Sequence, residues 1–307
     1  MKSLVQTLFS GSLDIVGDVH GDLAALSNLM RQLGYEEDGF HPQGRRLVFV
    51  GDLTDRGPDS PTVVETVRGL IQAGRAQCVL GNHELNIMLG HQKFDNGWFF
   101  GKKFYDGVTG QHVIQHLTTE PAAREDLVAF FNTLPLVLQR EDVRVVHACW
   151  QPEMVAMASE ATDVIKLYEQ HRFNINLGLA IRSDLKDWQK EQRHQNLNPV
   201  KVLTSGLEVK AEEPIEASGK TRKLDRYPWW QDYRDDAICL FGHYSQPYGQ
   251  PRGPQRAICV DFGIARRWVP KVPGDRSPEK WRLAALRYPE MQIAFDNGGV
   301  EPIELTG

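Results

Sequence analysis

The sequence predicts an α/β fold built on parallel strands, and observations on its first 90 residues support this prediction. Apolar runs of strand length occur at residues 13–16, 47–50 and 77–80. Two segments with apolar residues at helical spacing lie between them, at 23–33 and 60–71. Strands that alternate with helices in this way form layered sheets with helices on their faces. Each apolar run also ends in a polar motif, at the strand end where ligands bind in open α/β sheets.

The helix boundaries carry their own signals. Asp22 can cap the first helix through its side chain, and Gly34 is placed to end that helix. Pro61 lies in the first turn of the second helix, where its missing N–H costs no hydrogen bond. The run 47–50 is fully apolar, which is typical of a strand buried on both faces.

The rest of the chain has weaker patterns. We expect a loop-rich segment at 91–120, a helix that includes 127–131, and one helix at about 154–170. Little β-structure is expected around that last helix. Further short strands are predicted at 136–139, 143–147, 237–241, 257–261, 281–287 and 291–295.

The composition limits the class of protein and its partners. The net charge is −5 and basic residues occur only in short clusters, so stable binding of nucleic acid is not expected. No apolar stretch approaches the length of a membrane span, and no membrane partner is expected. The four cysteines lie in or beside apolar runs, as buried free thiols do. The first polar motif begins at Gly17 and leaves no room for a signal peptide, so we predict a cytoplasmic protein.

Residues of metal-binding type follow the first three predicted strands. The segments are Gly17-Asp18-Val19-His20-Gly21, Gly51-Asp52-Leu53-Thr54-Asp55-Arg56-Gly57 and Gly81-Asn82-His83-Glu84. Two later histidines, His147 and His243, also follow apolar runs. Carboxylate, amide and imidazole groups together form a mixed oxygen and nitrogen site, which suits Mn, Fe, Zn or Co.

The charge of this ligand set indicates the chemistry. The predicted metal ligands are Asp18, His20, Asp52, Asn82, His147 and His243. Two carboxylates against two divalent ions leave a net charge of about +2, which attracts a phosphate oxyanion and lowers the pKa of a coordinated water. Asp52 follows the middle strand, so its carboxylate can bridge both ions. We therefore predict a hydrolase with two divalent metal ions, with Mn favoured.

Three residues beside the ligands fit roles in cleavage of a phosphoester. His83 can protonate a leaving alkoxide, and Asp55 can orient that imidazole. The planar guanidinium of Arg56 matches phosphate oxygens. We predict His83, Asp55 and Arg56 to be catalytic, and Arg56, Asn82 and His83 to contact the substrate.

These segments resemble the signature motifs of the calcineurin-like metallophosphoesterase superfamily. They are similar to those of the phosphoprotein (Ser/Thr) phosphatases and their bacterial relatives, which include the symmetrical diadenosine tetraphosphate hydrolases. The similarity is close over 13–84 and resumes at 145–149 and 240–244, with a weaker match at 260–263. The resemblance implies an α/β (α+β) fold with four layers, a ββ sandwich flanked by helices with the metal site at the strand ends.

The resemblance also implies how the ligands are shared. One ion would be held by Asp18, His20 and Asp52, and the other by Asp52, Asn82, His147 and His243. His83 with Asp55 would form an acid pair, and Arg56 would bind phosphate. A hydroxide that bridges the ions would attack phosphorus in line, without a phosphoenzyme intermediate.

The chain departs from both groups of relatives. Eukaryotic phosphoprotein phosphatases have Gly-Gly where this chain has Ala148-Cys149, and their further phosphate-binding arginine has no match, since Arg182 lies in that region in different surroundings. Diadenosine tetraphosphate hydrolases typically lack the aspartate of the acid pair and have Asp after Asn-His. This chain has Asp55 and Glu84 instead, which favours a phosphomonoesterase of the phosphoprotein phosphatase type.

Three functions remain open at this point. The favoured one is hydrolysis of phosphomonoesters, either phosphoproteins or small phosphate esters. An alternative is hydrolysis of diadenosine tetraphosphate or another dinucleoside polyphosphate, or of a phosphodiester, at the same metal site. The third is an inactive binding module on the same scaffold, although such modules usually lose ligands and none is missing here.

The length of the chain favours a single domain. With 307 residues it lies near the size at which single cores stop growing. We therefore predict one catalytic domain over 1–307. Residues 85–135 and 151–236 are expected to be insertions that line or cover the site and determine specificity.

Overall fold

The computed structural model describes residues 2–101, 116–217, 220–246, 256–270 and 274–303. Its helices are α1 (Leu23–Leu33), α2 (Ser60–Gln72), α3 (Asn82–Met88), α4 (Gly97–Phe100), α5 (Pro121–Phe131), α6 (Pro152–Ser159), α7 (Val164–Ala180), α8 (Asp187–Asn196), α9 (Pro199–Ser205) and the 3-10 turns η1 (Trp229–Gln231) and η2 (Ile264–Arg267). Its strands are β1 (Val5–Thr7), β2 (Leu13–Val16), β3 (Arg46–Phe49), β4 (Ala76–Cys78), β5 (Val137–Gln139), β6 (Val143–Val146), β7 (Glu208–Ala217), β8 (Lys220–Arg226), β9 (Ile238–Phe241), β10 (Ala257–Cys259), β11 (Ala284–Tyr288), β12 (Gln292–Phe295) and β13 (Val300–Pro302).

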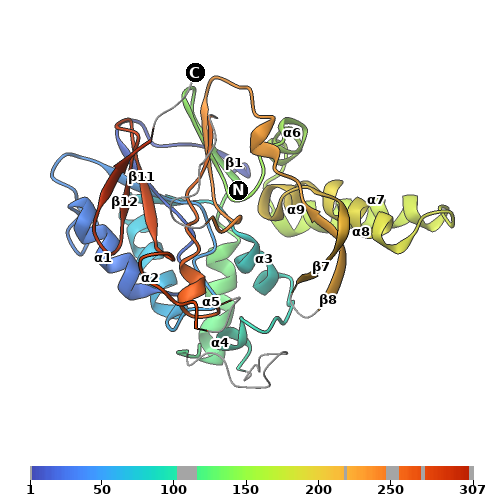
Figure 1. The fold of residues 1–307 in the computed structure, drawn as a ribbon, viewed down its shortest axis with the longest axis horizontal. Coiled ribbons are helices and arrows are strands. Elements are labelled where there is room, and N and C mark those ends of the chain that lie inside the picture. Colours follow the sequence, from blue (N-terminus) through green and yellow to red (C-terminus); the bar gives the residue numbers. More distant parts are fainter. Residues whose placement is uncertain (1, 102–115, 218–219, 247–255, 271–273, 304–307) are drawn as a thin grey trace.

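Two sheets form the centre of the molecule. One has the order β1-β5-β6-β9-β10 and the other the order β13-β12-β11-β2-β3-β4. Buried side chains from both sheets share one apolar cluster, which includes Ile15 and Val48 from one sheet and Val145 and Leu240 from the other. Helices α1 and α2 lie on one side of the sheets, and α6 and α9 lie on the other (Figure 1). This arrangement confirms the predicted sandwich of two sheets flanked by helices.

The first 90 residues form the predicted alternation of strands and helices. β2, β3 and β4 are parallel neighbours. Asp22 accepts a hydrogen bond from the Ala25 amide at 3.0 Å and so caps α1, while Gly34 ends that helix in the left-handed conformation. Helix α2 begins at Ser60, next to Pro61, as predicted. The parallel pairing brings the carboxyl ends of the three strands to one edge of the sheet.

The segment 151–236 differs from its prediction. The single helix expected at 154–170 is two helices, α6 and α7, because Asp163 accepts from the Lys166 amide at 3.0 Å and starts a new helix. The segment also contains a β-hairpin, β7–β8, which was not predicted. Its strands are rich in charged residues because they pair with each other and pack on α8 rather than in the main core.

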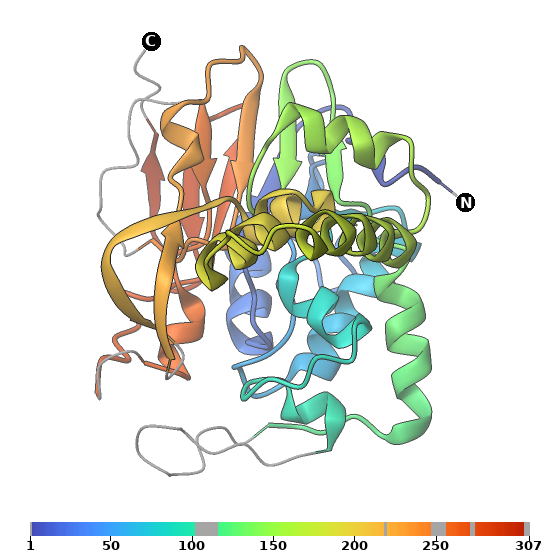
Figure 2. The ribbon, with the colours of Figure 1, turned by 90° about the vertical axis from the view of Figure 1, so that its right-hand side faces the viewer.

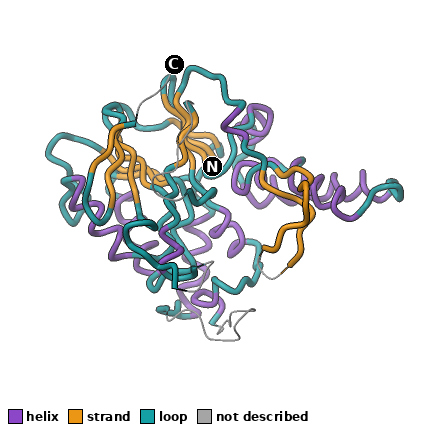
Figure 3. The backbone as a smooth tube through the Cα atoms, in the orientation of Figure 1, coloured by secondary structure: helices purple, strands orange, loops and turns teal. Residues whose placement is uncertain are grey.

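The helices α7 and α8 project from the sandwich. Figure 1 shows them extending away from the two sheets, and in Figure 2 α7 runs across the middle of the view while the hairpin lies at the left, below the strands. The hairpin stands apart from both sheets (Figure 3). It is tied to α8 by the side chains of Gln192 and Asn196, which donate to the Glu208 carbonyl oxygen at 2.9 and 2.8 Å.

Several other features bear on the predictions. Helix α5 begins six residues before the predicted helical segment. The four cysteines are buried and free, as predicted. None of the helices in the described part of the chain is both long and apolar enough to cross a membrane.

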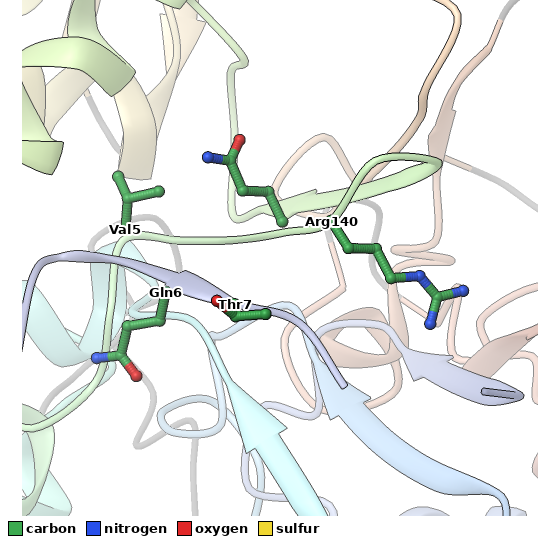
Figure 4. A pocket seen from close by; sticks show the side chains of 5 residues that line it. Val5, Gln6, Thr7 and Arg140 are labelled. Carbon is green, nitrogen blue, oxygen red and sulfur yellow. The ribbon is translucent and has the colours of Figure 1, made fainter. Parts of the chain in front are cut away.

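A polar hollow of about 440 Å³ lies beside the paired strands β1 and β5. It is lined by Val5, Gln6, Thr7, Gln139 and Arg140. Figure 4 shows that the side chains of Val5, Gln6 and Arg140 point in different directions rather than toward a common centre. Arg140 is already occupied, since it donates to the carbonyl oxygen of Phe9 and to the carboxylate of Asp142. The hollow therefore offers no cluster of free functional groups.

One polar residue lies in a strand that is otherwise apolar. Asp14 of β2 is fully buried, and its carboxylate accepts two hydrogen bonds from Arg45, from Nε at 2.9 Å and from Nη2 at 2.8 Å. The hydroxyl of Tyr35 donates to the same carboxylate at 2.8 Å. The Asp14 carboxylate thus links β2 to the loop between α1 and β3. Burial of this carboxylate without its hydrogen-bond partners would cost free energy.

We predict that Asp14→Ala lowers the free energy of unfolding by about 3–5 kcal/mol, because it leaves the buried Arg45 guanidinium without its main partner. Chemical denaturation monitored by circular dichroism measures the change. The control is Glu169→Ala, which breaks an exposed ion pair with Arg172 and is expected to cost less than about 1 kcal/mol. Equal effects of the two substitutions would show that the Asp14 network does not stabilise the fold.

Candidate metal centre

The predicted metal ligands all follow the carboxyl ends of strands. Asp18 and His20 follow β2, Asp52 follows β3, Asn82 begins α3 after β4, His147 follows β6, and His243 follows β9. β6 and β9 are parallel neighbours in the second sheet. The two sheets therefore contribute ligand-type side chains to one place from distant parts of the sequence, and Asp18 and His243 are 225 residues apart along the chain.

Asp52 lies at the centre of this group. One carboxylate oxygen is 3.3 Å from Nε2 of His147, and the other is 3.9 Å from Nε2 of His20 and 3.8 Å from Nε2 of His83. The side chain of Asp52 is almost completely buried. A carboxylate that faces histidines on both sides has the geometry of a bridging ligand.

Asn82 joins the two later histidines. Its Oδ1 is 2.7 Å from Nδ1 of His243 and 3.1 Å from Nε2 of His147. The sets His20–Asp52–His83 and Asp52–His147–His243 each bring three possible ligand atoms close enough to hold a metal ion. Asp18 lies beside the first set, with its carboxylate 3.9 Å from Nε2 of His20.

The orientation of the histidines fits metal ions. Nδ1 of His147 donates to the Val50 carbonyl oxygen at 2.6 Å, and Nδ1 of His20 donates to the Thr54 carbonyl oxygen at 3.0 Å. Each Nε2 then faces the Asp52 carboxylate, and a backbone carbonyl that holds the other nitrogen is the arrangement found in metal-bound histidines. Burial, together with nearby positive charge, holds the pKa of His20 and His243 well below its usual value, so both imidazoles are neutral, as metal ligands must be.

The carboxylates concentrate negative charge in the same place. Burial and the neighbouring carboxylates of Asp261 and Asp52 raise the pKa of Asp18 well above its usual value. Burial also acts to raise the pKa of Asp52, but His147 and His83 outweigh it and hold this pKa well below the usual value. Divalent cations bound among these groups would relieve the repulsion. The residues present therefore fit two metal ions.

His83 and Asp55 form a buried pair. Nδ1 of His83 donates to Oδ2 of Asp55 at 2.6 Å, and the indole nitrogen of Trp98 donates to Oδ1 of the same carboxylate at 2.5 Å. Burial lowers the pKa of His83, but the carboxylates of Asp52, Asp95 and Asp55 outweigh it and raise the pKa to about 9. A buried imidazolium held in this way can donate a proton from Nε2, which faces the metal-binding residues.

Arg56 lies on the other side of His20. Its Nε donates to Oδ2 of Asp95 at 3.0 Å, and its Nη1 is 3.3 Å from Nε2 of His20. About a quarter of the side chain is exposed. The salt bridge to Asp95 fixes the plane of the guanidinium and leaves donors directed toward the site, which suits a phosphate oxygen.

The backbone of the site is in unusual conformations. Non-glycine residues with positive φ at the site are His20 (48°), Asp52 (49°), Asp55 (72°), Arg56 (70°) and His243 (68°). Such conformations are uncommon outside glycine and concentrate at functional sites. Close approach adds a second constraint, because a Cβ on Gly242 would lie 2.0 Å from Oδ1 of Asp18. Only glycine fits before His243.

Glu84 has a structural position that the sequence did not indicate. Its side chain is fully buried and accepts hydrogen bonds from the backbone amides of Asp52, Leu53, Thr54 and Gly81 at 2.9–3.2 Å. The Thr54 hydroxyl donates to it as well. Glu84 therefore holds the loop that carries Asp52 against the loop that carries Asn82, and its carboxylate faces backbone rather than substrate.

Further residues at the site were missed by sequence reasoning. Asp95 and Trp98 come from the irregular segment 85–135, where no periodicity placed them near the strand ends. Asp261, in the weakly matched segment, accepts from the Ser245 amide at 2.6 Å and the Gly263 amide at 2.8 Å, and so shapes the loop after His243. Arg182 is not at the site: it lies in the exposed turn between α7 and α8 and pairs with Asp184.

Tryptophan side chains anchor the segments 85–135 and 151–236 beside the site. Trp98 is buried and bonded to Asp55, and Trp229 is buried with its indole nitrogen donating to the Ala148 carbonyl oxygen at 2.8 Å. Trp230 is half-buried and stacks on Phe241 with ring centroids 5.5 Å apart. These contacts attach segments 85–135 and 151–236 to the metal-binding residues.

We predict that Glu84→Gln lowers the free energy of unfolding by about 2–4 kcal/mol. The NH₂ group of the glutamine side chain cannot accept hydrogen bonds, so some of the buried backbone amides would lose their acceptor. Thermal and chemical denaturation measure the loss. The control, Glu65→Gln, changes a half-exposed carboxylate that pairs with Arg68 and is expected to change stability by less than about 0.5 kcal/mol. A Glu84→Gln protein of unchanged stability but altered substrate preference would assign Glu84 to substrate binding instead.

Several known proteins have sequences similar to this one. A family model for calcineurin-like phosphoesterase matches residues 12–266. The chain is 50% identical over 291 residues to a protein of Geobacillus sp. (strain WCH70) named bis(5'-nucleosyl)-tetraphosphatase PrpE (asymmetrical), with 91% of each chain covered. The protein of the same name from Geobacillus thermodenitrificans (strain NG80-2) is 46% identical over 289 residues, also with 91% of each chain covered.

The fold is also found among solved structures. A crystal structure of a point mutant of a cold-active protein tyrosine phosphatase aligns with 98% of this chain and 82% of its own, with a TM-score of 0.51 and 15% identity. At that identity the similarity concerns the fold alone. The family match confirms the resemblance of the strand-end motifs and the prediction of a hydrolase that acts on phosphoester bonds. The chain belongs to the calcineurin-like phosphoesterase family.

Proposed function

We propose that this enzyme hydrolyses dinucleoside tetraphosphates and divides the phosphate chain unequally between the two products. The observation that carries the proposal is the 50% identity, over 91% of both chains, to a protein named as an asymmetrical bis(5'-nucleosyl)-tetraphosphatase. This substrate corresponds to the alternative reading of the sequence rather than to its favoured one. The features that favoured a phosphomonoesterase were Asp55 and Glu84, and Glu84 binds backbone amides, so it carries no information about the substrate.

We further propose that two divalent ions, with Mn favoured, bind between the strand ends. Their ligands would be Asp18, His20 and Asp52 on one side and Asp52, Asn82, His147 and His243 on the other. The ions supply a Lewis acid that neutralises phosphoryl oxygens and lowers the pKa of a bound water. The distances from the Asp52 carboxylate to the surrounding imidazoles support a bridging role for this residue.

The chain's own residues would then act on the substrate as follows. Arg56 binds the phosphoryl group under attack and is held in place by Asp95. His83 donates its Nε2 proton to the leaving oxygen, while Asp55 and Trp98 hold the imidazole in position. An anhydride releases a phosphate, which is a better leaving group than an alkoxide, so the proton from His83 matters less for this substrate than for an ester.

A second candidate is the hydrolysis of phosphomonoesters, on phosphoproteins or small molecules. The observation that favours it is the intact His83–Asp55 pair at 2.6 Å, since cleavage of an alkyl ester depends most on a general acid. Both reactions use the same metal-binding residues. We propose that the segments 85–135 and 151–236 select between them, because both segments anchor beside the site through Trp98 and Trp229.

One prediction from the proposed function concerns the products. With Mn²⁺ present, diadenosine tetraphosphate should yield ATP and AMP, with a kcat/KM at least about tenfold higher than that for p-nitrophenyl phosphate or a phosphopeptide. Anion-exchange chromatography separates these products from ADP. Treatment with EDTA should abolish turnover, and added Mn²⁺ should restore it. Hydrolysis of the phosphopeptide with the dinucleotide left intact would instead support the second candidate.

Another prediction concerns the role of His83 as a proton donor. His83→Asn should lower turnover of p-nitrophenyl phosphate by about 10²–10⁴-fold, because the proton donor is lost. The loss for diadenosine tetraphosphate should be smaller, since its leaving group needs less protonation. Elemental analysis should find the same metal content as in the unmodified protein. Loss of metal on substitution would show that His83 is a ligand, as its distance of 3.8 Å from Asp52 would allow.

A further inference from the structure

One turn of the chain, at the start of α4, contacts both groups that would act on the phosphoryl group. Oδ2 of Asp95 accepts a hydrogen bond from Nε of Arg56 at 3.0 Å. Three residues later, Nε1 of Trp98 donates to Oδ1 of Asp55 at 2.5 Å, and the other oxygen of that carboxylate holds His83. Arg56 and the His83–Asp55 pair are therefore supported from the same short segment.

The turn from Asp95 to Trp98, which we call the brace, is itself held in the fold. The buried side chain of Asn96 donates to the His91 carbonyl oxygen at 2.9 Å and accepts from the Lys93 amide at 2.8 Å. These two bonds close the loop before α4. The indole of Trp98 is almost completely buried. A segment fixed in this way can hold neighbouring side chains in one geometry.

The loop that the brace contacts depends on outside support. Asp55 and Arg56 both have positive φ, at 72° and 70°. Consecutive non-glycine residues in the left-handed region persist only where surrounding contacts determine their conformation. Backbone bonds from the same part of the chain add to the side-chain contacts, since the Arg56 amide donates to the Asp95 carbonyl oxygen at 3.4 Å and the Leu117 amide donates to the Pro58 carbonyl oxygen at 2.9 Å.

Arg56 has a physical reason to need a fixed partner. An arginine side chain is long and flexible, and a guanidinium that is already held in place loses less entropy when an anion binds. The carboxylate of Asp95 is buried, so solvent screens its salt bridge to Arg56 only weakly. The same oxygen of Asp95 is 3.9 Å from Nδ1 of His83, which is too far for a hydrogen bond. The direct partner of Asp95 is therefore Arg56.

Asp55 depends on Trp98 for its orientation. The Asp55 carboxylate is buried, so both of its oxygens need donors from the protein. His83 contacts Oδ2 and Trp98 donates to Oδ1. Loss of the indole N–H would leave Oδ1 without this donor and allow the carboxylate to rotate. The imidazole of His83 would then be held less firmly.

We propose that Asp95 and Trp98 are positioning residues with separate tasks. Asp95 acts through Arg56 on the binding of the phosphoryl group under attack. Trp98 acts through Asp55 on the donation of a proton by His83. The inference rests on the roles proposed above for Arg56 and His83, but it holds for either candidate substrate, because both present a phosphoryl group to the same residues. It gives the inserted segment that contains the brace a part in the reaction itself.

Inhibition by orthophosphate tests the task of Asp95. Hydrolysis of p-nitrophenyl phosphate is measured at a fixed concentration of free Mn²⁺ with orthophosphate as the competitor. Asp95→Asn should raise the inhibition constant about tenfold, as loss of a supporting partner commonly does, while elemental analysis finds an unchanged metal content. Asp95→Ser also removes the charge and replaces the Asn variant if that variant does not fold.

The same measurement in the Arg56→Ala background separates positioning from a general structural effect. There Asp95→Asn should raise the inhibition constant by less than about a further twofold, because a residue that acts through another loses its effect when the other is removed. Equal weakening in both backgrounds, or loss of metal with Asp95→Asn alone, would overturn the task assigned to Asp95.

The kcat for phenyl phosphate tests the task of Trp98, since the leaving phenolate is basic and requires a proton. Trp98→Phe keeps an aromatic ring without the N–H and should lower kcat about tenfold, with the orthophosphate inhibition constant within about twofold of the unmodified value. The matched control is Phe99→Leu, which removes volume from the next buried side chain of α4 and should leave kcat within about twofold, because only packing is lost. Equal losses of kcat in the two variants, or an unchanged kcat with Trp98→Phe, would contradict the proposal.

The control for Asp95→Asn is Asp126→Asn, which removes a carboxylate from an exposed ion pair with Arg68. It should leave both kcat and the inhibition constant within about twofold of the unmodified protein. A loss as large as that caused by Asp95→Asn would show that removal of any carboxylate from this part of the chain has the same effect, which would contradict the specific role of Asp95.

Failure of this inference and failure of the proposed function are distinguishable. If the enzyme leaves diadenosine tetraphosphate intact while the Asp95 and Trp98 variants behave as expected, the proposed substrate is wrong and the positioning roles stand. If the dinucleotide is cleaved and neither variant differs from its control, the function stands and the positioning roles are wrong. If Arg56→Ala alone leaves orthophosphate inhibition unchanged, the role proposed for Arg56 is wrong and the task of Asp95 is wrong with it.

Discussion

The carboxylate of Asp52 is the contact on which the rest of the site depends. It lies between histidines that come from both sheets, 3.3 Å from His147 and 3.9 Å from His20. Its backbone amide is held by the buried side chain of Glu84, which binds the neighbouring loop as well. The relative position of the two sheets therefore decides whether the ligand-type side chains of one sheet reach those of the other.

The loops that carry these side chains have strained backbone conformations. His20, Asp52 and His243 all have positive φ, and the glycine before His243 leaves no space for a side chain against Asp18. Strained backbone persists where surrounding contacts determine it, and here buried hydrogen bonds to Glu84 and Asp261 supply those contacts. Metal ions bound among the carboxylates would add to this stabilisation, so the loops and the ions are expected to support each other.

Much of the fold and the grouping of the predicted ligand side chains could be predicted, because their signals are local. Buried parallel strands appear as apolar runs, and their ends carry the motifs, so Asp18 to His83 could be placed in space from spacing alone. The hairpin β7–β8 could not be predicted, because its residues are charged and its pairing is sustained by α8 rather than by an apolar face. Asp95 could not be placed either, since it reaches the site from a segment without periodicity. The segments proposed above to select the substrate contain residues of this second kind.

The most direct test of the account is the position of the metal ions. Crystals grown with Mn²⁺ and measured at the manganese absorption edge should show two anomalous peaks roughly 3.5–4 Å apart, with the Asp52 carboxylate between them. Asp18 and His20 should contact one peak, and Asn82, His147 and His243 the other. A single peak, or a peak held by His83, Asp55 and Asp95, which also lie close enough together to bind a cation, would contradict the two-metal centre proposed here.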